Sequence, residues 1–250
     1  MKKYQNYIFD FYGTLVDIKT DEGRIGLWQQ LAELYQAFGA SYDAQELKTA
    51  YSKLVKESEH ELAEQVTYEH VEIDLTSIFI RLLQESLKKN PTEGRVIDLA
   101  TFGQVMANTF RVLSRERLVA YENSLSSLQA LKESGARLFI LSNAQRVFTQ
   151  AEIEGTGCAT FMDKIYISSD YQMKKPEPAF LRMVLEENGL CDEDTVMVGN
   201  DLTSDIAVAH AVGIDSILLN TFPHSQTDIQ ACKDKGWDFI VIEDIAELLN

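Results

Sequence analysis

The feature that most constrains the fold is a recurring series of short apolar runs, most of them separated by stretches with helical periodicity. Runs such as Leu138–Leu141 are apolar at nearly every position, which is typical of strands that helices cover on both faces. Alternating strands and helices favour a parallel sheet. The sequence therefore predicts an α/β fold with a doubly wound parallel sheet, whose strands we expect at Tyr7–Phe11, Arg137–Leu141, Lys164–Ser168, Thr195–Val198, Ser216–Leu219 and Phe239–Ile242.

One long interval interrupts this alternation. Between Asp21 and Arg117 no convincing strand is found, and apolar residues recur at helical spacing, with Asn90-Pro91 as a break. The interval leaves the carboxyl end of the first strand, which is where open α/β sheets bind their ligands. We therefore expect an inserted α-helical cap domain. The predicted domains are a core at 1–17 and 118–250 and a cap at 18–117, with flexible joints at Asp17–Glu22 and Glu116–Asn123.

The charge balance limits the partners of the chain. It has 39 acidic and 23 basic residues, a formal net charge of −16, which repels nucleic acid and anionic membrane surfaces. A small anionic substrate would need a local positive group or a metal ion. The three cysteines are widely spaced and predict reduced thiols, and neither a signal run nor a membrane-length segment is found. These observations favour a cytoplasmic protein, and a monomer and a homodimer both stay open.

Two motifs follow predicted strands directly. Asp10 lies at the end of the first strand, ahead of a turn at Gly13, although a strand-end carboxylate is often structural. Ser142 and Asn143 follow a later strand, where a hydroxyl and an amide can hold an oxyanion or cap a helix. Each motif alone leaves its structural interpretation open.

Two further motifs add charged groups. In Lys174-Lys175-Pro176 the proline restricts Lys175, which can neutralise a carboxylate and a substrate anion, whereas Lys174 fits a solvated loop residue. Asp201 and Asp205 follow another strand, and one helical turn separates them if a helix begins there. Such hard oxygen ligands suit Mg²⁺, and a helix cap would explain one of them.

The order of these motifs, with a helical insertion after the first, resembles the haloacid-dehalogenase-like superfamily, in the branch whose cap lies between the first two motifs. The resemblance implies a Rossmann-like core and covalent catalysis, in which Asp10 attacks the substrate and water hydrolyses the aspartyl intermediate. By this resemblance Ser142 and Lys175 stabilise the transferring group, supported by the substrate-binding residues Thr14 and Asn143. It also implies a Mg²⁺ site formed by Asp10, the backbone carbonyl of Tyr12 and Asp201, with Asn200 and Asp205 as further ligands.

Tyr12 departs from the pattern of the phosphatases in this superfamily. They usually carry a second aspartate there as the acid and base, whereas a phenol with a pKa of about 10 is a poor base at neutral pH. Tyr12 is therefore a catalytic candidate by position, and its alternative is a packing role. The Asp-x-Tyr form resembles the haloacid dehalogenases, which need no metal. Their cap arginine is absent from Ala50–Lys53, however, and their tyrosine six residues after the motif lysine is Leu181 here.

The sequence accordingly predicts a Mg²⁺-dependent phosphatase of small phosphorylated metabolites, acting through an aspartyl-phosphate intermediate. One alternative is a metal-independent 2-haloacid dehalogenase, which Tyr12 favours. A second is a non-catalytic regulatory module that binds metal and phosphate. The identity of the substrate stays open.

Overall fold

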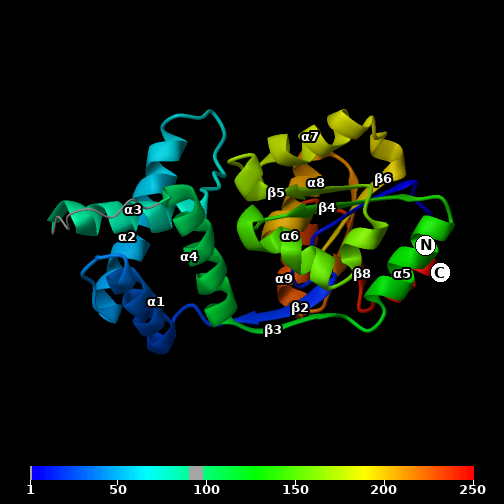
Figure 1. The fold of residues 1–250 in the computed structure, drawn as a ribbon. Helices are drawn as coiled ribbons and strands as arrows, with labels where there is room; N and C mark the ends of the chain where they lie inside the picture. Colours follow the sequence, from blue (N-terminus) through cyan, green and yellow to red (C-terminus); the bar gives the residue numbers. More distant parts are fainter. Residues whose placement is uncertain (1, 90–97) are drawn as a thin grey trace. The chain divides into compact units, whose positions relative to one another are not determined.

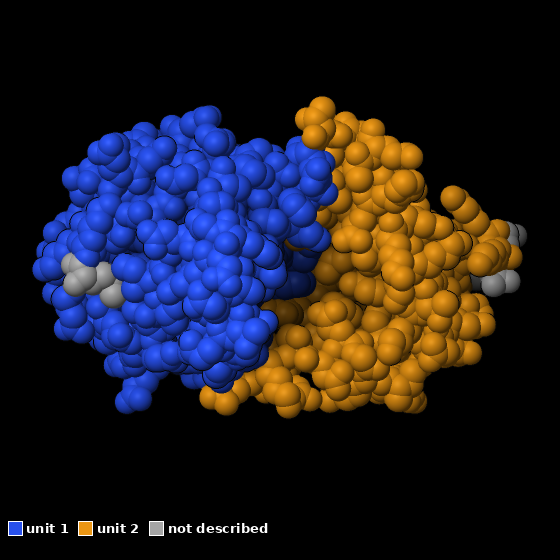
Figure 2. All heavy atoms as spheres, turned by 180° about the vertical axis from the view of Figure 1, so that it is seen from behind, with its two compact units in different colours: residues 1–18, 68–70, 118–250 blue, residues 19–67, 71–117 orange. Residues whose placement is uncertain are grey.

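The computed structural model describes residues 2–89 and 98–250, so the predicted break at Asn90-Pro91 lies outside the described residues. The chain divides into two compact units (Figure 2). Unit 1 comprises residues 1–18, 68–70 and 118–250, and unit 2 comprises residues 19–67 and 71–117. Within the described ranges, no helix combines the length and apolar character needed to cross a membrane.

Unit 1 contains a six-stranded sheet with the order β5-β4-β1-β6-β7-β8, in which neighbouring strands are parallel (Figure 1). Every predicted strand is present, which confirms the doubly wound α/β fold. Strand β1 lies between β4 and β6, with Phe9 opposite both Ile140 and Val198, so the carboxyl ends of these three strands meet. The strands are β1 Asn6–Phe9, β4 Arg137–Ser142, β5 Lys164–Ile167, β6 Thr195–Gly199, β7 Asp215–Leu219 and β8 Ile240–Ile242.

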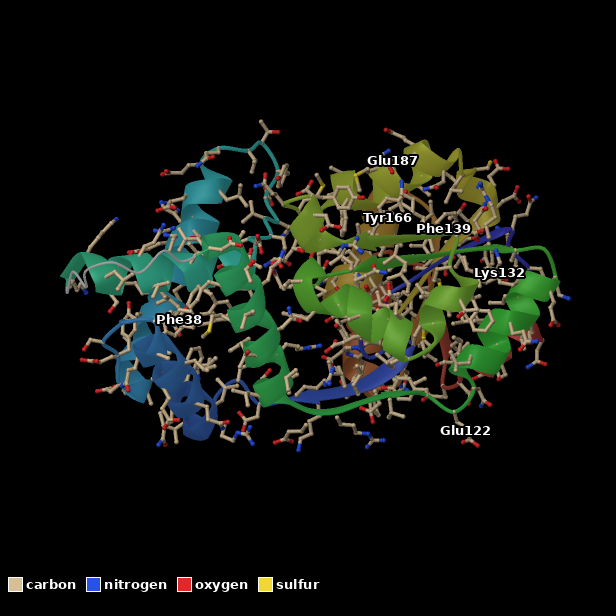
Figure 3. All side chains as sticks on the ribbon, viewed as in Figure 1. Phe38, Glu122, Lys132, Phe139, Tyr166 and Glu187 are labelled. Carbon is tan, nitrogen blue, oxygen red and sulfur yellow. The ribbon has the colours of Figure 1, made fainter. Side chains whose placement is uncertain are left out.

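Helices cover both faces of this sheet. Tyr7 and Phe9 of β1 pack on one face with Leu128 and Ile153, which belong to α5 (Ser124–Glu133) and α6 (Arg146–Gly155). Ile8 points to the opposite face, because side chains alternate along a strand. That face packs against α7 (Pro178–Asn188) and α8 (Ala207–Val212), and Phe139 and Tyr166 belong to the same cluster (Figure 3). Helix α9 (Gln226–Asp234) packs through Ile229 in a third cluster.

Unit 2 is helical, as the periodicity predicts. It contains α1 Ile25–Ala37, α2 Ala44–Ala63, α3 Leu75–Lys89 and α4 Leu99–Ser114. Aromatic side chains from different helices meet inside it, with ring centroids 5.7 Å apart for Trp28 and Phe110 and 5.6 Å apart for Phe79 and Phe110. Such contacts add to the hydrophobic stabilisation of a helical bundle. Helix α2 begins at a capping box made by Asp43 and Glu46.

Both predicted joints, Asp17–Glu22 and Glu116–Asn123, contain strand residues that the sequence did not predict. Strand β2 (Val16–Thr20) and strand β3 (Arg115–Ala120) form a two-stranded sheet, and the boundary between the units falls inside each strand. Charged residues interrupt the apolar positions of both strands, which hides their β pattern in the sequence. Backbone hydrogen bonds between β2 and β3 form these strands, although the periodicity of their side chains does not predict them.

Candidate active site

The candidate site lies at the carboxyl edge of the sheet in unit 1. Asp10 directly follows β1, and its backbone N–H donates to the carbonyl of Val198 in β6 at 2.9 Å. Ser142 ends β4, and Gly199 ends β6. The parallel register therefore brings three of the predicted motifs to one edge, as expected of ligand sites in open α/β sheets.

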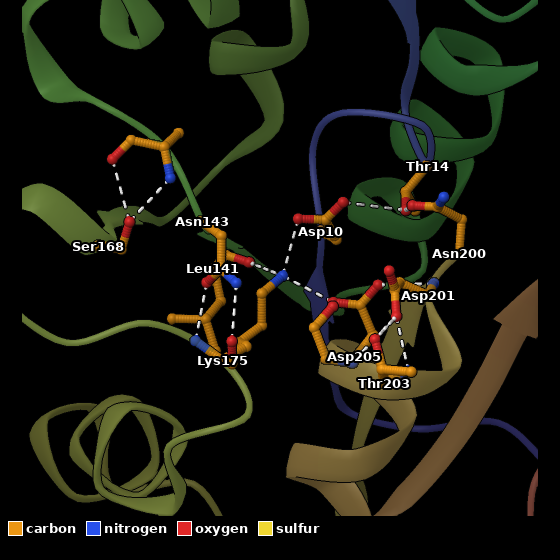
Figure 4. Close-up of polar contacts among 12 residues, drawn as sticks. Asp10, Thr14, Leu141, Asn143, Ser168, Lys175, Asn200, Asp201, Thr203 and Asp205 are labelled. Carbon is orange, nitrogen blue, oxygen red and sulfur yellow. Dashed lines mark hydrogen bonds and ion pairs between the residues drawn. The ribbon is translucent and has the colours of Figure 1, made fainter. Parts of the chain in front are cut away.

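The remaining motif, Lys174-Lys175-Pro176, places a buried lysine at the same edge. Lys175 Nζ donates hydrogen bonds of 2.7 Å to Asp10 Oδ1, to Asp205 Oδ1 and to the carbonyl of Leu141 (Figure 4). The Lys175 side chain is 1% exposed, and those of Asp10 and Asp205 are 11% and 1% exposed. All three donors of the ammonium are thus satisfied, as burial of a charge requires. The alternative of a solvated loop residue does not apply to Lys175.

Burial and charge oppose each other in this cluster. Burial alone would lower the pKa of Lys175, but the Asp10 and Asp205 carboxylates raise it above its ordinary value. Burial raises the pKa of Asp205 to about 6, although Lys175 acts in the opposite direction. Lys175 therefore keeps its positive charge. Asp205 is the carboxylate whose ionisation is disfavoured by burial.

Asn143 and Thr14 support the two charged residues. The Asn143 side chain accepts from the backbone N–H of Lys175 and donates to its carbonyl, both at 2.8 Å. The Thr14 hydroxyl lies 3.1 Å from Asn200 Oδ1 and 3.4 Å from Asp10 Oδ2. The structure thus brings both predicted substrate-binding residues next to the catalytic candidates, where Asn143 fixes the lysine loop.

Ser142 differs from its neighbours, because it is fully buried and its hydroxyl is unpaired. It is one of two buried side-chain oxygens without a hydrogen-bond partner among the described residues. Such groups are rare, since leaving one unpaired costs about 1–3 kcal/mol. The hydroxyl has its bonding capacity available for a ligand.

Asp201 and Asp205 occupy different roles around the end of β6. Asp201 Oδ1 accepts from the N–H groups of Thr203 and Ser204, so it caps the π-helical turn Leu202–Ile206 that precedes α8. Asp205 Oδ2 accepts from the backbone N–H of Asp201 at 3.0 Å. The N-cap interpretation is correct for Asp201, and it leaves Oδ2 of that residue outside the cap.

The donor set fits a hard divalent cation. Lys175 pairs with two carboxylates, Asp10 and Asp205, and Asp201 adds a third acidic group next to Asp205, so a phosphorylated ligand would meet surplus negative charge without a cation. Within the described ranges no group of three or more His, Cys, Asp or Glu side chains forms a metal cluster. The predicted Mg²⁺ site needs fewer side-chain ligands than such a cluster, because Mg²⁺ takes one or two carboxylates together with carbonyl and water oxygens. Both Asp205 oxygens already accept hydrogen bonds, which suits an outer position.

Tyr12 turns to a pair of polar residues on α6. Its hydroxyl lies 3.1 Å from Thr149 Oγ1 and donates to the carboxylate of Glu152, which is buried. Sequence reasoning missed Glu152, although its spacing from Phe148 and Thr149 places it on the buried face of that helix. A catalytic role of Tyr12 stays a prediction, and its packing against Phe11 accompanies this polar contact.

Comparison with known proteins identifies the family. Residues 7–219 match the family model described as haloacid dehalogenase-like hydrolase. The chain belongs to this family. The match begins within β1 and ends with β7, and so it includes all four motifs of the site.

Phosphatases and dehalogenases are both found among the similar proteins. A glyceraldehyde 3-phosphate phosphatase of Methanothermobacter thermautotrophicus is 30% identical over 128 residues, 51% of this chain and 56% of the relative. The chain spans about half the length of the first curated relatives it matches, at 56%, 50% and 43%. A solved 2-haloacid dehalogenase of Pseudomonas syringae superposes with a TM-score of 0.64 at 18% identity, covering 98% of both chains. A phosphatase of the same family from Thermococcus onnurineus has a TM-score of 0.61 at 18% identity, covering 99% of this chain and 96% of its own. These two structures share the fold and do not separate the activities.

Proposed function

We propose that this hydrolase is a Mg²⁺-dependent phosphatase of small phosphorylated metabolites, with Asp10 as its nucleophile. The observation that carries the proposal is the buried hydrogen bond between Lys175 and Asp10, made at the edge where the unpaired hydroxyl of Ser142 lies. The names of the curated relatives, phosphatases among them, support phosphate over halide. We also propose that residues 18–117 form a cap domain and that residues 1–17 and 118–250 form the core domain.

The proposed reaction has two steps. Asp10 Oδ2, to which Lys175 does not bond, attacks phosphorus while the bond to the leaving oxygen breaks, and that oxygen takes up a proton from water. Water then attacks the aspartyl phosphate, releasing inorganic phosphate and the free carboxylate. The Lys175 ammonium and the Ser142 hydroxyl stabilise the charge on the transferring group.

Asp10, the Tyr12 carbonyl and Asp201 would hold the Mg²⁺, with Asn200 and Asp205 outside them. When bound, the ion would offset the surplus negative charge and polarise the phosphoryl oxygens. Asn200 and Asp205 have a positioning role, since Thr14 contacts the first and Lys175 the second.

Turnover of a panel of phosphate monoesters with Mg²⁺ tests the proposal. The matched control is Asp10→Asn, which keeps an oxygen for Lys175 and removes the nucleophilic carboxylate. We expect phosphate release by the wild type only, and a covalent phosphoryl adduct on the Asp10 peptide by mass spectrometry after rapid acid quench. Phosphate release at equal rates by both proteins would overturn the nucleophile assignment.

The second candidate function is haloacid dehalogenation, which the tyrosine at position 12 favours. It predicts halide release from 2-chloropropionate in the presence of EDTA. Metal and phosphate binding without turnover of either substrate class would instead support the regulatory module.

A further inference from the structure

Three residues of the segment between α2 and α3 group with unit 1, which contains the candidate active site. Tyr68–His70 belong to unit 1, whereas the residues before and after them belong to unit 2 (Figure 2). The chain therefore passes between the units at 67/68 and 70/71 as well as within β2 and β3. Nothing in the sequence of this segment announces such an attachment.

Hydrogen bonds attach this segment to the loop that carries Lys175. The carboxylate of Glu177 accepts from the backbone N–H of Glu69 at 3.0 Å and from that of His70 at 3.3 Å. The backbone N–H of Lys174 donates to the carbonyl of His70 at 2.9 Å. These contacts join parts of the chain more than 100 residues apart, at a sequence separation of 108 for Glu69 and Glu177.

Glu177 is the central group of this attachment. It is 8% exposed, and a buried carboxylate is costly unless donors surround it. Hydrogen bonds to a charged group stabilise more than hydrogen bonds between neutral groups. Both donors are backbone groups. The binding of Glu177 to residues 69 and 70 therefore depends on the backbone conformation of this segment and not on its side chains.

A second contact reaches the start of the same loop. The Tyr68 hydroxyl donates to the carbonyl of Gln172 at 3.1 Å. Gln172 has φ of 58°, and it is the one non-glycine residue with positive φ in the part of the chain that is described. A left-handed backbone is unfavourable for such a residue, so the surrounding contacts must hold it. Tyr68 supplies one of them.

We propose that Tyr68–His70 braces the Lys175 loop, and that Glu177 is a positioning residue for Lys175. The brace contacts Gln172, Lys174 and Glu177, on both sides of the lysine, while Asn143 holds the lysine backbone itself. Lys175 Nζ meets three oxygens at 2.7 Å, a geometry that a small shift of its backbone would break. The role for catalysis rests on the proposed phosphatase function.

The test measures the brace without requiring activity. In the full-length protein, Glu177→Ala removes both acceptors, whereas the control Glu69→Gln changes a side chain of the segment and keeps its backbone bonds. Amide hydrogen exchange reports the N–H groups of residues 69 and 70, and we expect at least a tenfold acceleration in Glu177→Ala only. Acetylation of Lys175, followed by mass spectrometry, should accelerate in the same variant as the loop releases the buried amine.

Activity then separates positioning from structure. A brace that positions Lys175 lowers kcat in Glu177→Ala about tenfold, with a smaller change in KM. Unchanged amide exchange, or faster exchange with unchanged Lys175 labelling and kcat, overturns the proposal. If Glu177→Ala does not fold, Tyr68→Phe removes only the hydroxyl contact with Gln172 and should accelerate exchange and labelling to a smaller extent. Absence of wild-type turnover would sink the phosphatase proposal, while exchange and labelling still decide the brace.

Discussion

Replacing Lys175 by methionine tests the charge arrangement of the site directly. The substitution keeps the length of the side chain and removes the ammonium that holds Asp10 and Asp205. Each carboxylate oxygen lies 2.7 Å from Nζ, so the two are no more than twice that distance apart. Two negative charges about 5 Å apart repel by roughly 3 kcal/mol at an effective dielectric of about 20. Removing one partner of a buried ion pair typically costs about 3–5 kcal/mol, and we expect that loss near pH 8.

The loss should shrink in acid. Without Lys175, which lowers it, the pKa of Asp205 rises above its wild-type value of about 6. The folded variant then binds a proton that the unfolded chain, with a carboxyl pKa of about 3.9, does not, so its stability falls as pH rises through that window. Protonation of one carboxylate at pH 5 relieves the repulsion.

Urea unfolding followed by circular dichroism at pH 8 and pH 5 measures both effects. The matched control is Lys132→Met, because Lys132 pairs with Asp163 at the surface of the same unit, at 2.8 Å and about one third exposed. An exposed pair contributes about 0–1 kcal/mol, with little change between these pH values. Equal losses for the two variants, or a Lys175→Met loss that does not depend on pH, would refute the reasoning.

Three other perturbations have defined outcomes. Ser142→Ala removes a buried hydroxyl without a partner among the described residues, so the free energy of unfolding should stay the same or rise by up to about 1–3 kcal/mol, while kcat falls about tenfold or more; a clear loss of stability would contradict the ligand role. Gly199→Ala places a Cβ 2.2 Å from Asp205 Cγ and should cost about 1–3 kcal/mol in thermal unfolding, whereas Gly155→Ala, with no atom within 4 Å, should cost nothing. The hydrogen bond from Lys2 lowers the pKa of Asp215, so the stability lost in Asp215→Asn, about 0–1 kcal/mol for this half-exposed pair, should be present at neutral pH and vanish in acid as pH falls through that lowered pKa; a constant difference would contradict this.

The fold could be predicted because its strands are buried on both faces. Runs such as Leu138–Leu141 show burial at every position, and the insertion shows the helical period. Strands β2 and β3 were not predicted, because they are only partly buried and their charged residues conceal the alternation of apolar and polar positions. A pattern of apolar residues indicates which segments are buried. A two-stranded sheet buries few side chains, so this pattern does not reveal its strands.

The site was predictable wherever a residue follows a buried strand. Asp10 and Ser142 were found in this way, and register alone brings them together. Glu177 and Glu152 were missed for another reason: their partners lie far away in the sequence, at the backbone of Glu69 and the hydroxyl of Tyr12. Contacts that depend on backbone groups or on a single distant hydroxyl leave no periodic signal.

Tyr12 leads to the last prediction, which concerns the leaving group. In a phosphatase the leaving oxygen needs a proton, and the Tyr12 hydroxyl donates its own to Glu152. Leaving groups that depart as anions avoid this requirement, so kcat/KM should rise steeply with leaving-group acidity across a series of substituted phenyl phosphates. Tyr12→Asp places a carboxyl group at this position and should flatten the dependence, whereas Tyr12→Phe should leave it steep. A shallow dependence in the wild type would mean that another group already delivers the proton.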